Sequence, residues 1–314
     1  MDIRQLTALV AVAEGGSFSA AARALHTVQS NVSTHIARLE RELGALLVDR
    51  ATGTLTEEGR IVLDRARRIQ VELAAIAADV AAVRNQITGH VRLGCIGTVG
   101  RWLVPAVFSR LTEAYPLVDL VVVDATTSSL VPQLLSDSLD LAVVNLPLSD
   151  PEIVTVPLFE EDHLVIAPEG HPLWGRDSVG LAELADHELL LEPVGTSFRD
   201  ELDAAAAAVG VTLRPQAEVD GLRLIATLAF QGFGAALVPV TAAPPYFVGS
   251  FPITRVPVEG LARRTVGLAA RRRALPSAPS RAVREVVLKV VADGTLDLEG
   301  IHPLAPGRAT AHEE

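Results

Sequence analysis

Short hydrogen-bonding side chains cluster on one face of a predicted helix between residues 28 and 43. The other face is apolar at helical spacing, with Val28, Val32, Ile36, Leu39 and Leu43. The polar set comprises Gln29, Ser30, Asn31, Ser33, Thr34 and Arg38. Amide, hydroxyl and guanidinium groups of this kind reach base edges and phosphates from the major groove of DNA. The pattern predicts a DNA-contacting helix, and a solvated helix of a generic bundle is the alternative.

A second set of candidate residues, for binding a small effector, lies where predicted strands turn into helices. It comprises Thr98, Val99, Gly100, Ser128, Asn145, Thr196, Ser197 and Phe198. Backbone N–H groups and hydroxyls at such turns point outward at the carboxyl edge of a sheet, where they can hold a small anion such as a carboxylate. We therefore expect the hydroxyl of Thr98 to face a ligand. Taken singly, each of these residues is more often a helix cap than a ligand contact.

No arrangement of residues predicts catalysis. Ser197 lies in the run G-T-S-F-R rather than in the G-x-S-x-G motif of hydrolases, and the run G-F-G at 232–234 is not a complete dinucleotide fingerprint. The eight histidines show no paired metal-ligand spacing, and the single cysteine, Cys95, falls in an apolar run typical of a core. We expect a protein that is not an enzyme and that holds neither a cofactor nor a metal.

One long helix is predicted to hold two copies of the chain together. From Glu57 to Ile87, apolar residues recur at alternating spacings of four and three. They are Val62, Ala66, Ile69, Leu73, Ile76, Val80, Val83 and Ile87. This 3.5-residue repeat is typical of a coiled-coil seam. Thr56 is expected to cap the helix start and Thr88-Gly89 to end it. We interpret the helix as a dimerising connector, with a long core helix of one domain as the alternative.

Before the connector, apolar spacing predicts helices over 3–14 and 18–25, followed by the DNA-contacting helix. Ser17 is a favourable N-cap for the second helix, and the small Ala21 and Ala22 allow another helix to cross closely. Two short helices joined by a tight turn predict a helix-turn-helix.

After the connector, strands and helices alternate. Strands at 90–97, 117–124 and 139–145 with helices at 100–114 and 128–137 predict a parallel βαβαβ unit. A second α/β set comprises strands at 164–167, 188–191, 216–219 and 235–240 and helices at 197–209 and 222–230. A strand at 265–269 and a helix at 280–291 follow. The pattern predicts two α/β lobes.

Charge and hydropathy limit the partners. The net charge is −11, yet residues 1–90 hold ten arginines and ten acidic residues, so the N-terminal part is neutral and all of the negative charge lies beyond it. A neutral head predicts modest nonspecific affinity for DNA. The N-terminus has no signal-peptide pattern and no apolar run is long enough to span a membrane. We expect a cytoplasmic protein.

Two motifs in the N-terminal part resemble a known family. The run G-S-F-S-x-A-A-x-x-L from Gly16, and the run Q-S-x-V-S-x-x-I-x-x-L-E-x-x-L-G from Gln29, resemble the winged helix-turn-helix of LysR-type transcriptional regulators. The resemblance continues through Arg50 into the connector. It implies a DNA-contacting third helix, a wing, and a connector that serves as dimer interface. We count Ser17 and Arg50 with the polar set above as DNA-binding residues.

The resemblance also implies the domain organisation. We expect a winged helix-turn-helix domain at 1–58, a dimerising linker helix at 59–88 and an effector-binding domain at 89–296. Its lobe I covers 89–162 and 266–296 and its lobe II 163–265, an architecture similar to periplasmic solute-binding proteins. Residues 297–314 are predicted to be an unstructured tail.

The expected function is a LysR-type regulator that binds promoter DNA as a homodimer or homotetramer. A small metabolite such as a carboxylate, bound between the lobes, would alter that binding. The alternative is a soluble solute-binding or enzymatic α/β module whose N-terminal helices serve only association. The polar face from Gln29 to Arg38 and the missing export signal favour the regulator.

Overall fold

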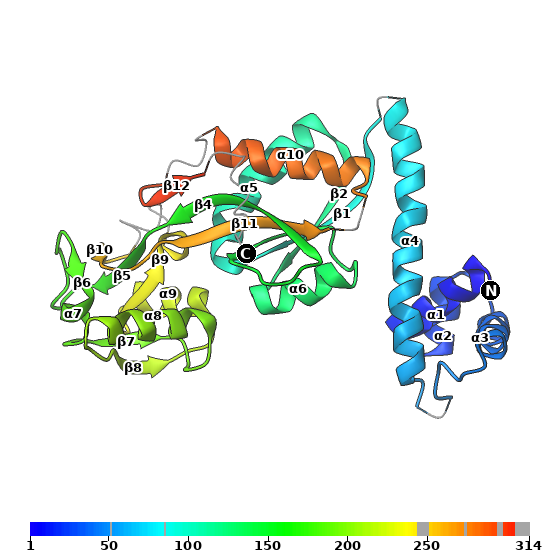
Figure 1. The fold of residues 1–314 in the computed structure, drawn as a ribbon, viewed down its shortest axis with the longest axis horizontal. Coiled ribbons are helices and arrows are strands. Elements are labelled where there is room, and N and C mark those ends of the chain that lie inside the picture. Colours follow the sequence, from blue (N-terminus) through cyan, green and yellow to red (C-terminus); the bar gives the residue numbers. More distant parts are fainter. Residues whose placement is uncertain (51, 85, 244–250, 273–274, 294–297, 305–314) are drawn as a thin grey trace.

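The chain forms a helical head, one long helix and a body of two α/β lobes (Figure 1). The structure, a computed structural model, describes residues 1–50, 52–84, 86–243, 251–272, 275–293 and 298–304. This is the fold class predicted from the sequence. Among the described residues, no helix is both long and apolar enough to cross a membrane.

The head packs three helices around one apolar core: α1 (Ile3–Gly15), α2 (Phe18–Ala24) and α3 (Gln29–Leu43). The Ser17 hydroxyl accepts a hydrogen bond from the Ala20 backbone N–H at 3.1 Å and so caps α2, as predicted. Gly16 ends α1 with a left-handed φ of 65°, which a side chain would strain. These local signals set the tight turn between α1 and α2.

Two apolar residues that were predicted to face inward on α3 are exposed. Val28 is the N-cap, where the backbone is extended, and Leu43 is the last helical residue before the chain turns away at Gly44. Between them Val32 and Ile36 are buried as predicted. Helical periodicity therefore identifies the packed face in the middle of α3 but not at its ends.

The connector is α4 (Glu57–Val83), shorter than predicted. Thr56 caps its start as expected, since its hydroxyl accepts from the Gly59 N–H at 2.9 Å. The predicted end near Ile87 is wrong: Arg84 is the C-cap, and the chain has already entered a strand at Thr88. The apolar repeat continues past the end of the helix to Ile87, directly before this strand, so spacing alone could not place the boundary.

The seam of α4 changes its surroundings along the helix. Val62 and Ala66 pack against the core of the head. The seam residues that follow are all exposed in the single chain: Ile69, Leu73, Ile76, Val80 and Val83. Such an uncovered apolar stripe on one helix face is unfavourable in water.

Lobe I contains a six-stranded sheet in the order β12-β4-β11-β3-β1-β2. Its strands are β1 (Thr88–Cys95), β2 (Leu117–Asp124), β3 (Leu141–Leu146), β4 (Ile153–Glu161), β11 (Arg264–Arg271) and β12 (Ile301–Pro303). Helices α5 (Gly97–Ala114), α6 (Thr127–Leu135) and α10 (Ala278–Ala292) pack on it. β1 is parallel to both β2 and β3, as the βαβαβ pattern predicted.

Lobe II contains a second six-stranded sheet in the order β6-β10-β5-β9-β7-β8. Its strands are β5 (His163–Pro168), β6 (Val179–Gly180), β7 (Glu188–Leu191), β8 (Arg214–Glu218), β9 (Ala235–Pro239) and β10 (Ile253–Glu259). Its helices are α7 (Leu181–Leu184), α8 (Ser197–Ala208), α9 (Leu222–Phe230) and the 3-10 helix η1 (Val240–Ala242). The chain crosses between the lobes twice, from β4 to β5 and from β10 to β11.

Four strands were not predicted, namely β4, β6, β10 and β12. β6 has only two residues, and each of the other three contains a proline, respectively Pro157, Pro257 and Pro303, which normally argues against a strand. The predicted unstructured tail is wrong for residues 298–304, because Leu298 is buried in the core of lobe I and β12 pairs with β4. Residues 305–314 lie outside the described part of the chain.

Replacing Ile76 by Asp is predicted to prevent self-association. If two chains bury the seam of α4 against each other, an unpaired carboxylate there costs of order several kcal/mol. Light scattering is expected to give a lower mass for Ile76→Asp than for wild type. Ala74→Asp is the matched control, because Ala74 is exposed on the opposite side of α4. Equal masses for wild type and Ile76→Asp would remove the seam from the interface.

Candidate DNA-binding face and lobe junction

The polar face of α3 is open to solvent. Gln29, Ser30, Asn31, Thr34 and Arg38 are exposed, and Ser33 is half-buried. Several of these groups have local partners: Gln29 Oε1 accepts from the Ser19 hydroxyl at 3.2 Å, and the Asn31 amide donates to the Thr27 hydroxyl at 2.9 Å. The Thr34 hydroxyl donates to the Ser30 carbonyl. Exposed bonds of this kind exchange readily with water or with a ligand of similar polarity.

A buried carboxylate, Glu40, joins α3 to the wing. Its Oε1 accepts from the Leu47 and Val48 N–H groups at 3.0 and 3.3 Å, and its Oε2 lies 3.1 Å from the guanidinium of Arg50. A carboxylate without partners would be costly at this depth, so these bonds fix the wing against α3. Sequence reasoning missed Glu40. An acidic residue directly after an inward-facing leucine was the signal.

The wing itself is a minimal hairpin. Val48 and Leu55 form an antiparallel bridge, and the Asp49 N–H donates to the Thr54 carbonyl at 2.9 Å. Gly53 closes the turn with a left-handed φ of 74°.

Arg50 lies against the head. Its Nη1 donates to the Ser33 hydroxyl at 3.1 Å, and its guanidinium lies over the Phe18 ring, 5.6 Å from the centroid. The residue predicted to contact DNA thus braces α3 in this structure, and Ser33 is its partner. Ser17 is likewise occupied as the cap of α2.

The turn predicted to hold an anion in lobe I is buried. α5 starts at Gly97, not at Gly100, so Thr98 and Val99 fall in its first turn and face the interior. Gly100 donates its N–H to the Ile96 carbonyl within the helix. The expectation that the Thr98 hydroxyl faces outward is therefore wrong: it accepts a hydrogen bond from Arg264 at 3.0 Å.

A buried ion pair lies where the chain crosses between the lobes. Arg264 begins β11 and Glu161 ends β4, and Nε of Arg264 donates to Oε1 of Glu161 at 2.8 Å. Oε2 of Glu161 accepts from the Thr241 N–H at 3.0 Å, and Arg264 also reaches the Thr241 hydroxyl at 3.4 Å. The network thus links four places in the fold. Glu161 and Arg264 lie at the two crossings, Thr241 lies in η1, and Thr98 lies at the start of α5. Because both charges are paired and hydrogen-bonded, their burial is sustainable.

Ser128 and Asn145 lie at the carboxyl edge of the sheet in lobe I. The exposed Ser128 hydroxyl is 3.0 Å from that of Thr126. The Asn145 N–H donates to the Thr127 hydroxyl at 3.1 Å, and this bond ties β3 to the start of α6. Asn145 Oδ1 is buried without a hydrogen-bond partner among the described residues. This oxygen can therefore still accept a hydrogen bond.

In lobe II the predicted residues form the start of α8. The Thr196 hydroxyl accepts from the Arg199 N–H at 3.4 Å and donates to the Pro193 carbonyl at 3.0 Å, which is the role of a helix cap. Ser197 is exposed, and Phe198 is buried. Thr196 is thus the cap of α8, and Phe198 packs in the apolar core of lobe II.

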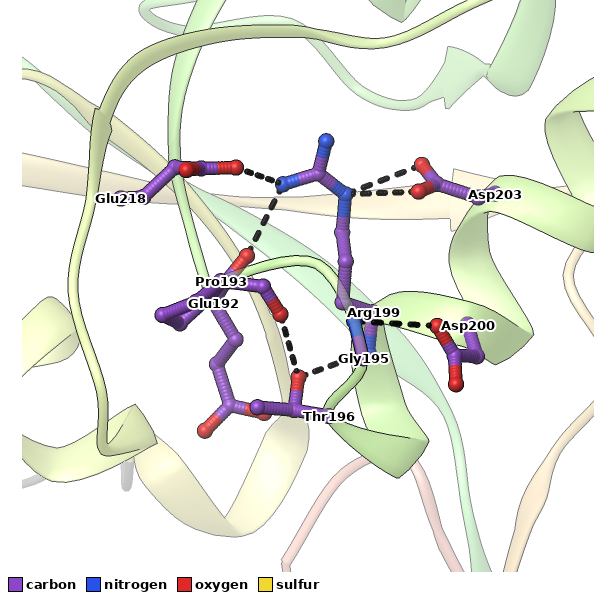
Figure 2. A network of polar contacts seen from close by, with 8 residues as sticks. All are labelled: Glu192, Pro193, Gly195, Thr196, Arg199, Asp200, Asp203 and Glu218. Atoms are coloured by element: carbon purple, nitrogen blue, oxygen red, sulfur yellow. Dashed lines mark hydrogen bonds and ion pairs between the residues drawn. The ribbon is translucent and has the colours of Figure 1, made fainter.

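Arg199 anchors this turn and was not predicted. It is buried, and it reaches Asp203, Glu218 and the Glu192 carbonyl at 2.9–3.0 Å (Figure 2). Asp200 accepts from the Gly195 N–H on the other side of the turn. The network fixes the loop before α8, so Thr196 to Phe198 are held rigidly.

His163 is a buried polar group next to this turn. Its ring stacks on Phe198 with centroids 5.5 Å apart, and neither ring nitrogen has a hydrogen-bond partner in the described part of the chain. Burial, with a smaller contribution from nearby Arg264, lowers the pKa of His163 to about 4. The ring is therefore neutral at physiological pH and offers one N–H donor and one acceptor.

A second ion pair joins the two lobes. Arg223 of α9 in lobe II binds Asp124 at the end of β2 in lobe I. Gly97 lies beneath it, and a Cβ there would come within 2.7 Å of both side chains. Arg223 and Arg264 thus already have a carboxylate partner, and so does Arg263 beside Arg264, which pairs with Asp162. A carboxylate ligand would have to compete with Asp124, Asp162 or Glu161.

Cys95 is a core residue. It is 1% exposed within the main apolar cluster of the body, and burial raises the pKa of its thiol to about 12. The thiolate is the reactive form, so this thiol is inert in the folded chain. The described residues contain no group of three or more His, Cys, Asp or Glu side chains arranged to hold a metal.

Two family models match the chain. "Bacterial regulatory helix-turn-helix protein, lysR family" covers residues 3–60, and "LysR substrate binding domain" covers residues 84–292. The Escherichia coli K12 protein named DNA-binding transcriptional dual regulator OxyR is 30% identical over 93% of this chain and 95% of its own length. A Mycobacterium leprae protein named probable hydrogen peroxide-inducible genes activator is 34% identical over 92% of this chain and 94% of its own.

Solved structures agree with the sequence matches. A full-length OxyR from Pseudomonas aeruginosa, in which a cysteine is replaced by aspartate, has a TM-score of 0.76 at 26% identity and covers 98% of this chain and 99% of its own. CbnR in complex with its target DNA has a TM-score of 0.67 at 26% identity and covers 92% of this chain and all of its own.

Replacing Gln29 and Arg38 by Ala is predicted to have different effects on DNA binding. Gln29→Ala should relax sequence preference by roughly 1–3 kcal/mol, since an amide can read a base edge. Arg38→Ala should weaken all sequences alike and reduce the salt slope by about one phosphate contact. Binding titrations at several salt concentrations measure both effects. Arg84→Ala, at the far end of α4, is the control, and a swapped outcome would exchange the two roles.

Replacing His163 by Met is predicted to flatten the loss of stability in acid. With a folded-state pKa near 4 against 6.5 for the free side chain, the unfolded chain alone takes up a proton as the pH falls below 6.5. The contribution of the neutral His163 ring to the free energy of unfolding is therefore fully present above pH 6.5. Below that pH it declines by up to about 1.4 kcal/mol per pH unit. The free energy of unfolding, measured with urea at several pH values from 7 to 4.5, should fall less steeply with decreasing pH in His163→Met than in wild type. An unchanged pH dependence in His163→Met would contradict this role of His163.

Proposed function

Because this chain belongs to the LysR family of DNA-binding transcriptional regulators, and is thus not an enzyme, we propose that a small ligand at the lobe junction controls its binding to promoter DNA. The observation that carries the proposal is the junction itself. Thr98, Glu161 and Arg264 connect both crossings with the start of α5, and His163 lies beside them. A ligand that touches both lobes binds one lobe angle more tightly than another, and only such differential affinity shifts a conformational equilibrium.

The DNA-binding unit we propose is a dimer. The exposed seam of α4, from Ile69 to Val83, would be buried against the same seam of a second chain. Each chain then presents one α3 to one half-site of a near-palindrome. The bodies would add further contacts in a tetramer. As a protein that acts on promoters, it would work in the cytoplasm.

We further propose that the ligand is uncharged. The arginines described at the junction are paired with carboxylates, and His163 is neutral. Burial also raises the pKa of Glu192 and of Glu201, near the start of α8. Unused hydrogen-bonding capacity remains on His163 and on Asn145 Oδ1. These surroundings favour a small molecule that both donates and accepts hydrogen bonds over the carboxylate expected from the sequence.

Hydrogen peroxide has the required chemistry, and the Mycobacterium leprae relative is named a probable hydrogen peroxide-inducible genes activator. A single cysteine cannot form a disulfide within one chain, and Cys95 is buried with a raised pKa. We therefore propose that peroxide acts on this chain by binding at the junction and not by oxidising Cys95. The alternative of a solute-binding or enzymatic module loses its support with family membership.

The response to peroxide is predicted to survive Cys95→Ala and to be lost in Thr98→Ala. The test is a titration of promoter DNA with wild type and each variant, with and without peroxide, with mass spectrometry of the Cys95 thiol. The thiol is expected to remain unoxidised and to react with a thiol reagent only after unfolding. Loss of the response in Cys95→Ala would establish thiol chemistry, and no response in wild type would exclude peroxide as the ligand.

A further inference from the structure

The connector helix contacts its own lobe I through a face distinct from the seam. Arg68 and Asp79 both bond to lobe I, and they are 11 residues apart, close to three turns of α-helix. They therefore share one face of α4. The next residue in each case, Ile69 and Val80, lies about 100° further round, on the exposed seam. Pairing of two chains along the seam leaves the Arg68 face free to hold lobe I.

Arg68 binds the end of α6. Its Nη2 donates to the carbonyl of Leu135, the last residue of α6, at 2.7 Å, and its Nε lies 3.0 Å from Asp137 Oδ2. Unpaired carbonyls and a partial negative charge at a helix C-terminus favour a cation there. Both side chains are largely buried, with 28% and 15% exposed, so solvent screens this pair less than an ordinary surface pair.

Asp79 binds the start of α10. Its Oδ1 accepts from the Ala278 N–H at 2.9 Å and from the guanidinium of Arg281 at 3.3 Å. The first N–H groups of a helix have no partner within it, so a carboxylate here is favourable. In Figure 1, α4 stands beside lobe I with the head at the end remote from β1. Two contacts about 16 Å apart along α4 fix an angle, which one contact would not.

Asp137 joins this contact to the interior of lobe I. It also binds Arg271, the last residue of β11, which in turn reaches Glu152 at 3.4 Å. β11 begins at Arg264 in the lobe junction, and α6 begins at Thr127, which bonds to Asn145. A strand and a helix that pack on each other thus each have one end near the junction and the other at Asp137.

We infer that Arg68 and Asp137 are positioning residues that set the angle between the DNA-binding head and lobe I, and that changes at the lobe junction reach the head through them. The inference rests on the proposed function and specifies how its signal travels. A change at the lobe junction shifts α6 and β11, and with them Asp137 at their far ends. Because Arg68 of α4 binds Asp137, this shift rotates α4. In a dimer, the two rotations change the separation of the two α3 helices and hence the bend of the DNA.

The test uses the full-length protein and a duplex with the two half-sites that wild type selects from random DNA. Bend is measured by energy transfer between dyes on the DNA ends, and affinity is measured for this duplex and for a single half-site. The variants are Arg68→Ala, Asp137→Asn and the two combined. Arg65→Ala removes the same charge from an exposed position of α4 as the matched control, and Arg68→Lys tests rescue by a conserved charge.

Arg68→Ala and Asp137→Asn are each expected to alter the bend and to change the affinity for the two-half-site duplex about fivefold, a typical coupling between sites. The bend in the combined variant should match that in the single ones, because each of the three variants breaks the contact between Arg68 and Asp137. Single-half-site affinity should stay at the wild-type value, which reports an intact head, and Arg65→Ala and Arg68→Lys should resemble wild type.

A wild-type bend and affinity in Arg68→Ala would overturn the inference while the proposed function stands. Effects of the two substitutions that add in the combined variant would also overturn it, because the residues would then act separately. Failure of wild type itself to select paired half-sites would instead overturn the proposed function, and the inference with it.

Discussion

One constraint shapes this molecule: the single helix α4 has an apolar seam that needs a partner and a neighbouring polar face that bonds to lobe I. The described part of the chain leaves the seam of α4 from Ile69 to Val83 uncovered, and apolar area left in water costs about 25 cal/mol per Å². The neighbouring face holds Arg68 and Asp79, which bond to lobe I. The helix can therefore join a second chain and its own body at once. In the proposed dimer, both contacts would position the DNA-binding head that is attached to the start of α4.

The second constraint is the buried pair of Glu161 and Arg264. Removal of one member of such a pair typically costs 3–5 kcal/mol, because the remaining charge stays buried without a partner. The pair lies at the two crossings and also holds Thr98, so the lobes and the start of α5 share one polar centre. Any change in lobe angle has to be accommodated there. This is why the junction suits a sensing site better than the exposed turns of either lobe.

Much of the fold followed from local patterns, and most of the site did not. Helical spacing, caps such as Ser17 and Thr56, and the βαβαβ alternation predicted the head, the connector and both lobes. The strands β4, β10 and β12, which each contain a proline, were missed, because propensity argues against them while sheet pairing overrides it. Thr98 was expected to face a ligand, yet its hydroxyl binds Arg264, which is 166 residues away in the chain. Such long-range partners leave no local signal in one sequence.

The number of chains on one DNA site tests most directly whether two chains pair along the seam of α4. Native mass spectrometry of the full-length protein bound to a DNA fragment that it selects from its own genome counts the chains. We expect an even number of chains, two or four, on a fragment with two half-sites, and a footprint on both halves. A complex of one chain with one fragment would contradict this pairing, since the seam of α4 would then have no partner and one head would suffice for recognition.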